Sequence, residues 1–113
     1  MNEKENLKIE EIFNQAIKNQ QKKNLQTAVN LYNQVLKINP NHFKSIYCLA
    51  TLFAQIKKFD LAKSLFEKAI QIQPNNAMVH NNLGSIFFET GQNQEAISSY
   101  EKAIQIQPNY LTA

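Results

Sequence analysis

The chain has 113 residues, of which 43% are hydrophobic, a composition that suits one folded domain and excludes a disordered chain. Its formal charge is +3, and all of its basic residues are lysine, a mild balance that argues against nucleic acid as a partner. No apolar run approaches the roughly 20 residues that span a bilayer, and the first residues lack the apolar stretch of a signal peptide. With Cys48 as its one cysteine, the chain is expected to be cytoplasmic, without a disulfide and without a membrane partner.

A repeat with a period of 34 residues organises the sequence, because the three prolines stand at positions 40, 74 and 108. The stretch 67–75 recurs letter for letter as 101–109, and 33–41 is a diverged copy. We therefore divide the chain into an extension of the first helix, three repeat units and the start of a further unit. These segments are 1–8, then 9–42, 43–76 and 77–110, then 111–113.

Each unit carries two apolar stripes at helical spacing, and the strict alternation of a strand is nowhere sustained. In the first unit the stripes are Ile9, Ile12, Phe13 and Ala16, then Ala28, Leu31, Tyr32 and Val35. In the second unit they are Ile46, Leu49, Ala50 and Phe53, then Ala62, Leu65, Phe66 and Ala69. In the third unit they are Leu83, Ile86 and Phe87, then Ala96, Ile97, Tyr100, Ala103 and Ile104. The pattern predicts an all-α fold, a stack of three antiparallel helix hairpins.

Turn and cap residues fall between the stripes. Gly91 can adopt the left-handed conformation that closes a helix. Asn24 and Asn93 are candidate N-caps for the second helices of the first and third units. Each proline is expected to end the second helix of its unit, because proline has no amide donor and disfavours helix in the residue before it.

Small residues recur in aligned columns, and helices approach to about 8–10 Å only where the side chains at their crossing are small. The columns are Ala16, Ala50 and Gly84; Ala28, Ala62 and Ala96; and Val35, Ala69 and Ala103. A fourth column, Tyr32, Phe66 and Tyr100, is expected to fill the space between hairpins. One hairpin cannot bury its apolar surface alone, so the units are expected to stack.

At these columns residues 9–110 resemble the tetratricopeptide repeat family. The third unit keeps most of the family signature, as Leu83, Gly84, Phe87, Ala96, Tyr100, Ala103 and Pro108. The first unit departs at Gln15, where the family prefers leucine, and at Asn19, where it prefers an aromatic residue. The RNA-reading pentatricopeptide repeats have a longer period and different columns. The resemblance implies a right-handed superhelix whose first helices line a concave groove for an extended peptide or a partner helix.

Carrying the family's groove columns onto this chain gives residues in the first helix of each unit. The expected peptide contacts are Phe13, Asn14, Ile17, Tyr47, Cys48, Thr51, Met78, Asn81, Asn82, Ser85 and Phe88. The same columns also contain Glu10, Gln21, Lys44, Gln55 and Glu89.

Two kinds of side chain in these columns suit peptide binding. Asn14 and Asn82 share a column that Cys48 interrupts, and a carboxamide can both donate to and accept from a peptide backbone. This arrangement resembles the asparagine ladder of O-linked N-acetylglucosamine transferases, although an asparagine-rich composition alone would also explain it. The aromatic rings of Phe13, Tyr47 and Phe88 would contact a guest or would pack between hairpins, and packing is at least as good an explanation for Phe13.

Two further sets of residues concern charged partners. The clamp with which heat-shock co-chaperones hold a C-terminal carboxylate would need basic residues and asparagine at fixed columns. Here those columns hold Phe13, Ile17, Cys48, Met78 and Asn82, and only the last one fits. The lysine pairs at 22–23 and 57–58 lie at the turns inside two hairpins, and so on one edge. They would attract an acidic partner or an anionic surface, or would simply be solvated.

No catalytic or metal-binding constellation is found in the sequence. His42 and His80 have no cysteine or acidic partner at metal-ligand spacing, and Cys48 lacks the context of a nucleophile. No glycine-rich phosphate loop is present. We expect no cofactor, no metal and no enzymatic activity of this chain.

The last unit is expected to leave Ile97, Tyr100 and Ile104 partly uncovered, because repeat arrays usually end in a polar capping helix. This favours either a fragment of a longer protein or a homo-oligomer formed through the last hairpin. The leading hypothesis for function is a scaffold that binds a protein or peptide in its groove. The alternatives are the substrate-recruiting arm of a larger enzyme, of glycosyltransferase or sulfotransferase type, and a self-assembling repeat without a separate ligand.

Overall fold

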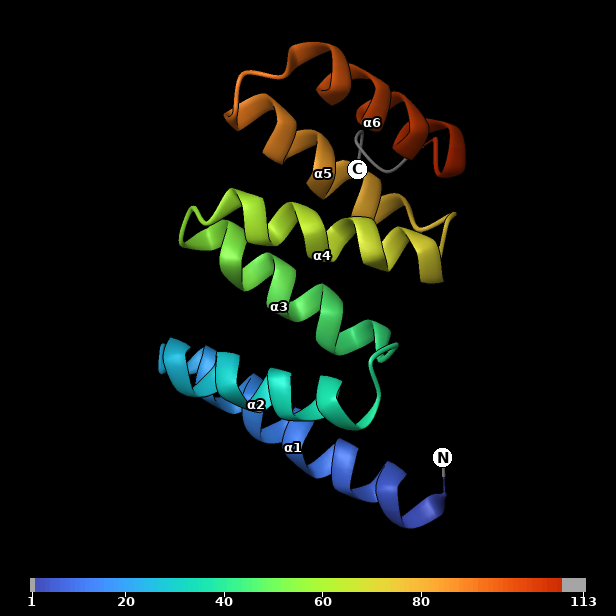
Figure 1. Ribbon diagram of the computed structural model, residues 1–113. Coiled ribbons are helices and arrows are strands. Elements are labelled where there is room, and N and C mark those ends of the chain that lie inside the picture. Colours follow the sequence, from blue (N-terminus) through green and yellow to red (C-terminus); the bar gives the residue numbers. More distant parts are fainter. Residues whose placement is uncertain (1, 109–113) are drawn as a thin grey trace.

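The computed structural model describes residues 2–108, and within this range it contains six helices and no strand. The helices are α1 (Glu3–Gln21), α2 (Leu25–Ile38), α3 (Phe43–Gln55), α4 (Phe59–Ile72), α5 (Ala77–Glu89) and α6 (Asn93–Ile106). They form three antiparallel hairpins stacked along one direction, with α1 at one end of the stack and α6 at the other (Figure 1). The all-α prediction is confirmed, whereas the superhelical hand stays a prediction.

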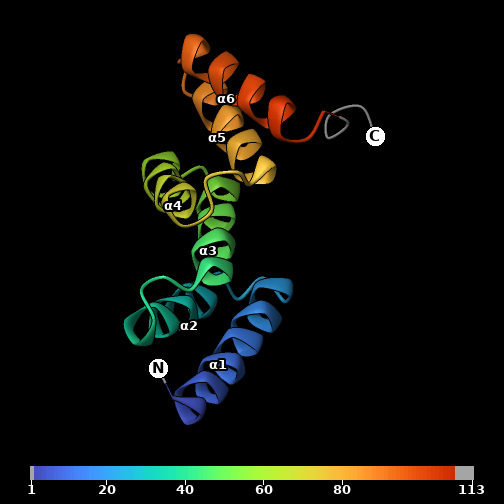
Figure 2. The ribbon, with the colours of Figure 1, turned by 90° about the vertical axis from the view of Figure 1, so that its right-hand side faces the viewer.

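The stack is elongated and its helices form two rows over the first two hairpins. The molecule measures 43 × 27 × 25 Å. Figure 2 shows α2 and α4 on one side, with α1 and α3 beside them. In the part of the chain that the structure describes, no helix is both long and apolar enough to cross a bilayer.

The turns inside the three hairpins use the same backbone geometry. Lys23, Lys57 and Gly91, which are 34 residues apart in sequence, have φ angles of 65°, 64° and 79°. The amide that follows each of them donates back to the preceding helix: for example, Lys58 N lies 2.8 Å from Phe53 O. The predicted left-handed conformation of Gly91 is confirmed, and the two lysines adopt it as well although it disfavours side chains.

The prediction that Asn24 and Asn93 cap the second helices is wrong, because neither side chain makes a capping hydrogen bond. Asn24 occupies the N-cap position of α2, but its side chain makes no capping bond, and its Nδ2 donates instead to Asn19 Oδ1 at 3.2 Å. Asn93 is the first residue of α6, and Gln92 stands at its N-cap. In both hairpins the N-cap residue directly follows the left-handed residue, Lys23 or Gly91, and the helix starts without a side-chain cap.

The proline prediction is confirmed, because α2, α4 and α6 each end two residues before a proline. The first helices of the second and third hairpins then start behind a genuine side-chain cap. His42 caps α3 by accepting from Ser45 N, and Asn76 caps α5 by accepting from Val79 N. Neither cap was predicted from the sequence.

The core lies between successive helices and is built on the predicted small-residue columns. Tyr32 and Phe66 are fully buried, and they pack against helices of their own hairpin and of the next one. Tyr100, the third member of their column, is half-buried. Its ring lies so close to Gly84 that a Cβ atom added there would be 2.7 Å from the ring carbons Cδ1 and Cε1. Glycine at this position therefore allows the last two helices to approach.

Candidate binding groove

A cavity of about 520 Å³ lies between α3 and α5. The rings of Tyr47, Phe59 and Phe66 give it aromatic walls, and Lys57 and Glu89 bring opposite charges to it. Its remaining lining residues are Thr51, Ala54, Gln55, Asn82, Ser85 and Ile86. A volume of this size suits a side chain or a short peptide segment.

The polar groups of this cavity are held in place by bonds between hairpins and within helices. Asn82 Nδ2 donates to the hydroxyl of Tyr47 at 3.0 Å, and this bond joins α5 to α3. The ring of Tyr47 lies edge-on to Phe66, with centroids 5.9 Å apart, and stacks on Phe43 at 6.2 Å. Packing and hydrogen bonding therefore fix the Asn82 carboxamide before any ligand arrives.

A second cavity, of about 420 Å³, lies one repeat earlier, between α1 and α3. Its lining consists of Ile17, Gln20, Gln21, Lys23, Cys48 and Gln55. Moving each of these residues 34 positions along the sequence gives Thr51, Ala54, Gln55, Lys57, Asn82 and Glu89, all of which line the larger cavity. The two cavities are thus the same feature repeated, and they meet at Gln55, which lines both.

The cysteine of the smaller cavity is a lining group in a protected setting. Burial raises the pKa of the Cys48 thiol, which keeps it neutral near pH 7. Burial also raises the pKa of the adjacent Tyr32 hydroxyl, which donates to Gln20 Oε1 at 2.5 Å. Because a nucleophilic cysteine needs a depressed pKa, this environment is typical of a structural thiol.

His42 lies at the junction between the first two hairpins. Its Nδ1 accepts from Ser45 N at 3.3 Å and lies 2.8 Å from Ser45 Oγ, while its ring meets Phe13 edge-on with centroids 5.4 Å apart. Burial, the largest cause, lowers the pKa of His42; Lys44 acts in the same direction and Glu10 against it. The imidazole is therefore held neutral, with Nδ1 as an acceptor.

The structure brings together about half of the residues that the sequence proposed for the groove. Those that line a cavity are Ile17, Tyr47, Cys48, Thr51, Asn82 and Ser85. Those that line neither cavity are Phe13, Asn14, Met78, Asn81 and Phe88. Phe13 packs against Tyr32 and His42, as the packing alternative for this ring proposed.

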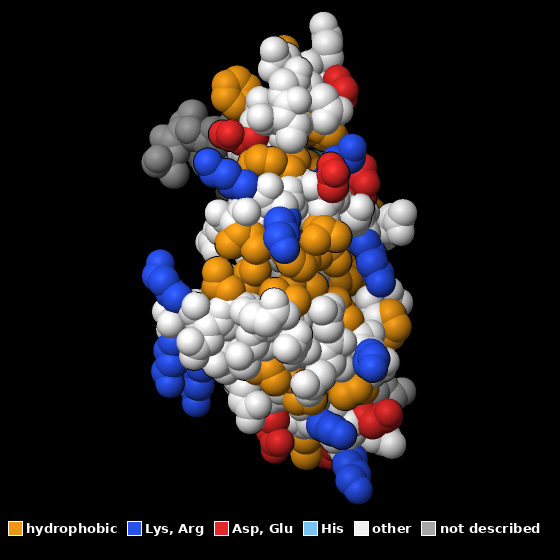
Figure 3. Space-filling view, turned by 60° about the vertical axis from the view of Figure 1, so that its left-hand side comes forward, with side chains coloured by type: hydrophobic (Ala, Val, Ile, Leu, Met, Phe, Trp, Pro, Cys, Tyr) orange, Lys and Arg blue, Asp and Glu red, His pale blue; other side chains and the backbone are white. Residues whose placement is uncertain are grey.

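Seven lining residues were not predicted from the sequence to belong to the groove: Gln20, Lys23, Ala54, Lys57, Phe59, Phe66 and Ile86. Lys23 and Lys57 come from the turns, Phe59 begins the second helix of its hairpin, and Gln20 lies beside a mapped column. The lysine pairs at 22–23 and 57–58 were the available signal for Lys23 and Lys57, since the sequence predicts that both pairs lie at turns on one edge of the stack. On the face that carries the hairpin turns, hydrophobic side chains gather across the middle of the molecule, with lysines around them (Figure 3).

The described residues contain no group of three or more histidine, cysteine, aspartate or glutamate side chains that could hold a metal ion. The fold and groove define a class of protein: an all-α repeat module made of stacked helical hairpins. Family models for the tetratricopeptide repeat match residues 43–109 and 19–42. The chain belongs to the tetratricopeptide repeat family, and it is a repeat module of the kind that mediates protein interactions.

Several solved structures share the fold of this chain. A structure of MamA is 19% identical with a TM-score of 0.85, and the match covers 93% of this chain and 61% of that one. MamA from Desulfovibrio magneticus RS-1 is 26% identical with a TM-score of 0.85, over 92% of this chain and 59% of that one. A mutant O-GlcNAc transferase from Thermobaculum terrenum is 24% identical with a TM-score of 0.86. There the match covers 97% of this chain and 21% of the transferase. A search of curated protein sequences gave no match.

Proposed function

We propose that the chain binds an extended segment of another protein along the surface of α1, α3 and α5. The observation that carries the proposal is the repetition of one cavity at the two successive junctions, joined at Gln55. A repeated cavity suits a guest that is itself a chain, because each hairpin can hold one short stretch of it.

The chemistry of the larger cavity fits a peptide. The half-buried rings of Tyr47 and Phe59 offer apolar contact for one guest side chain, and the fully buried Phe66 supports them from behind. The Asn82 carboxamide uses one of its N–H bonds for Tyr47, and the remaining carboxamide groups can bind a peptide backbone. Because Asn82 is already oriented, less entropy is lost when a guest binds.

The test is a screen of an array of unrelated peptides, followed by calorimetry on the best binder with Asn82→Ala and a control. We expect Asn82→Ala to weaken binding by more than twofold and up to about tenfold, since it removes a backbone contact worth about 0.5–1.5 kcal/mol. Asn33→Ala, on the exposed face of α2, should bind like the wild type. Unchanged affinity in Asn82→Ala would contradict the proposed groove.

A third variant separates the cavity from the asparagine ladder. Asn14 is exposed and lines neither cavity, although it shares the column of Asn82. If the cavities bind the guest, Asn14→Ala should leave the affinity within about twofold of the wild type. A loss as large as that of Asn82→Ala would instead support a ladder that extends along α1.

A second candidate function is self-association through the last hairpin. Ile97 and Ile104 on α6 are 56% and 43% exposed. Ile70, the residue equivalent to Ile104 one repeat earlier, packs against the core that α4 shares with α5. Sedimentation over a range of concentrations tests this proposal: a dimer should appear in the wild type and be lost in Ile97→Lys, which copies Lys63. A monomer at every concentration would exclude it.

A further inference from the structure

Two lysines adopt a backbone conformation that favours glycine, and they do so at the same place in two hairpins. Lys23 and Lys57 have φ angles of 65° and 64°, and Gly91 holds the equivalent place in the third hairpin with a φ of 79°. A side chain in this conformation costs free energy relative to glycine. The first two turns therefore carry an ammonium group at a position where glycine would make the fold more stable.

Each of these lysines lines one of the two repeated cavities. Lys23 lines the cavity between α1 and α3 together with Gln21, and Lys57 lines the one between α3 and α5 together with Gln55. The pair of lysine and glutamine is thus repeated with the 34-residue period. Ammonium and carboxamide groups share the ability to donate hydrogen bonds to an anionic oxygen.

The surrounding charges leave this edge of the groove positive. No acidic residue lines the smaller cavity, and Glu89 is the one carboxylate that lines the larger. Lys22 and Lys58, each next to a cavity lysine in sequence, are exposed and add to the positive potential. The turn of the third hairpin, 90–92, carries no charged residue.

We propose that the groove recognises an acidic peptide, with one carboxylate side chain of the guest at Lys23 and another at Lys57. This inference rests on the proposed function and gives it a ligand class. Three hairpins share a length of 43 Å, and 43/3 puts consecutive cavities no more than about 14 Å apart. An extended chain covers that distance in about three to four residues, which sets the spacing of the two carboxylates.

The experiment measures the fluorescence anisotropy of two labelled peptides as the protein is added at low ionic strength. One peptide carries glutamate at every third position with serine between, and the other carries glutamine in place of each glutamate. The test variant is the double substitution Lys23→Gly and Lys57→Gly, which copies Gly91 and so relieves backbone strain while it removes two charges. It is therefore expected to fold at least as stably as the wild type.

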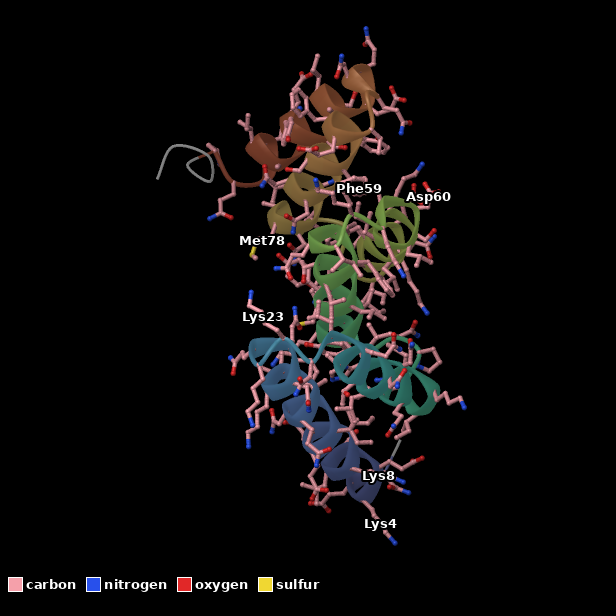
Figure 4. The ribbon with its side chains drawn as sticks, turned by 90° about the vertical axis from the view of Figure 1, so that its left-hand side faces the viewer. Lys4, Lys8, Lys23, Phe59, Asp60 and Met78 are labelled. Carbon is pink, nitrogen blue, oxygen red and sulfur yellow. The ribbon has the colours of Figure 1, made fainter. Side chains whose placement is uncertain are left out.

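The control is the double substitution Lys4→Gln and Lys8→Gln, which removes the same charge from a distant site. Figure 4 shows Lys4 and Lys8 at one end of α1 and Lys23 at the other, on the same edge as Met78. Both control residues are exposed. A loss of affinity that depends only on net charge would be the same in the two double variants.

We expect the glutamate peptide to bind wild type and control about tenfold more tightly than the glutamine peptide, as two exposed ion pairs allow. The glycine variant should bind both peptides alike. Equal affinity of wild type for the two peptides, equal losses in both double variants, or no binding of the glutamate peptide would each overturn the inference. These results do not decide whether the groove binds peptides at all. A neutral peptide whose binding depends on Asn82 would support the groove even if the acidic-peptide inference failed.

Discussion

The two junctions between hairpins share one backbone register but differ in the side chains that cross them. At the second junction Tyr47 of α3 meets Asn82 of α5 through a hydrogen bond of 3.0 Å. The equivalent residues at the first junction are Phe13 and Cys48, which offer neither a hydroxyl nor a carboxamide. There the rings of Phe13 and His42 meet in an edge contact instead. The second junction therefore has the better-defined polar site, and the first depends on aromatic packing.

The caps at the two junctions differ in the same way. His42 begins α3 and Asn76 begins α5, and each accepts a hydrogen bond from the backbone amide three residues later. The cap of the second junction cannot titrate, whereas that of the first carries a group with an ordinary pKa of about 6.5. The comparison teaches that a repeat can conserve the geometry of a junction while its response to pH and its capacity to bind vary.

The largest effect is expected where the core of the second junction is removed. Phe66 is fully buried and packs against α3 and α5, so Phe66→Ala should lower the free energy of unfolding by about 3–5 kcal/mol. Tyr100→Ala, in the same column but half-buried, should cost clearly less. Urea unfolding followed by circular dichroism measures both. Equal losses would mean that the last hairpin is packed as tightly as the junction.

The next effect concerns the close approach inside the third hairpin. Gly84→Ala places a Cβ atom 2.7 Å from the Tyr100 ring, and moving that ring should cost about 1–3 kcal/mol. The equivalent positions in the other hairpins are Ala16 and Ala50, which are tolerated beside Tyr32 and Phe66. Unfolding experiments on the double variant with Tyr100→Phe test whether the ring causes the loss of stability. Phenylalanine keeps the ring, so Gly84→Ala should be equally destabilising in that background. If Gly84→Ala no longer lowered the free energy of unfolding there, a clash with the ring would be contradicted.

The fold could be predicted from the sequence because its determinants are periodic. A 34-residue repeat with small residues in three columns leaves stacked hairpins as the arrangement that buries the apolar stripes. The caps were harder to predict. Asn24 has the right residue type at the right position, but the left-handed turn before it had already fixed the start of α2.

The groove could be predicted only in part, because lining a cavity depends on how hairpins are inclined as well as on helical register. The register of the first helices placed Tyr47, Thr51 and Asn82 in one groove, and all three line the larger cavity. It could not identify Lys57, whose place in the cavity depends on a left-handed turn that residue type alone disfavours. Nor could it identify Phe59, which belongs to the other helix of the hairpin.

Acid should weaken the first junction more than the second. Because burial lowers the pKa of His42 in the folded state, the folded protein binds fewer protons than the unfolded chain. The cap's contribution is therefore present above about pH 6.5 and is lost as the pH falls from there toward the lowered pKa. Protonated Nδ1 can no longer accept from Ser45, so the loss should approach the worth of an N-cap, about 1 kcal/mol.

The matched variant is His42→Asn, which gives the first junction the cap of the second. Its unfolding free energy should show a smaller decrease between pH 7.5 and pH 5 than that of the wild type, by about the 1 kcal/mol of the cap. Glu10 and Lys44, the charged neighbours of His42, stay in place, so the difference reports on the ring alone. Identical pH profiles for the two proteins would rule out His42 as the source.

The smallest effect on stability should come from removing the Asn82–Tyr47 hydrogen bond of the second junction, which the first junction lacks. Tyr47→Phe removes the hydroxyl that accepts from Asn82 and should cost about 0.5–1.5 kcal/mol, while the aromatic contacts with Phe43 and Phe66 remain. Double-mutant cycles with Asn82→Ala, measured by urea unfolding, isolate the bond itself. A coupling energy near zero would show that the bond adds no stability to the junction. If the bond also orients the carboxamide for a guest, Tyr47→Phe should weaken peptide binding more than it weakens folding, because an unheld Asn82 must be ordered each time a peptide binds.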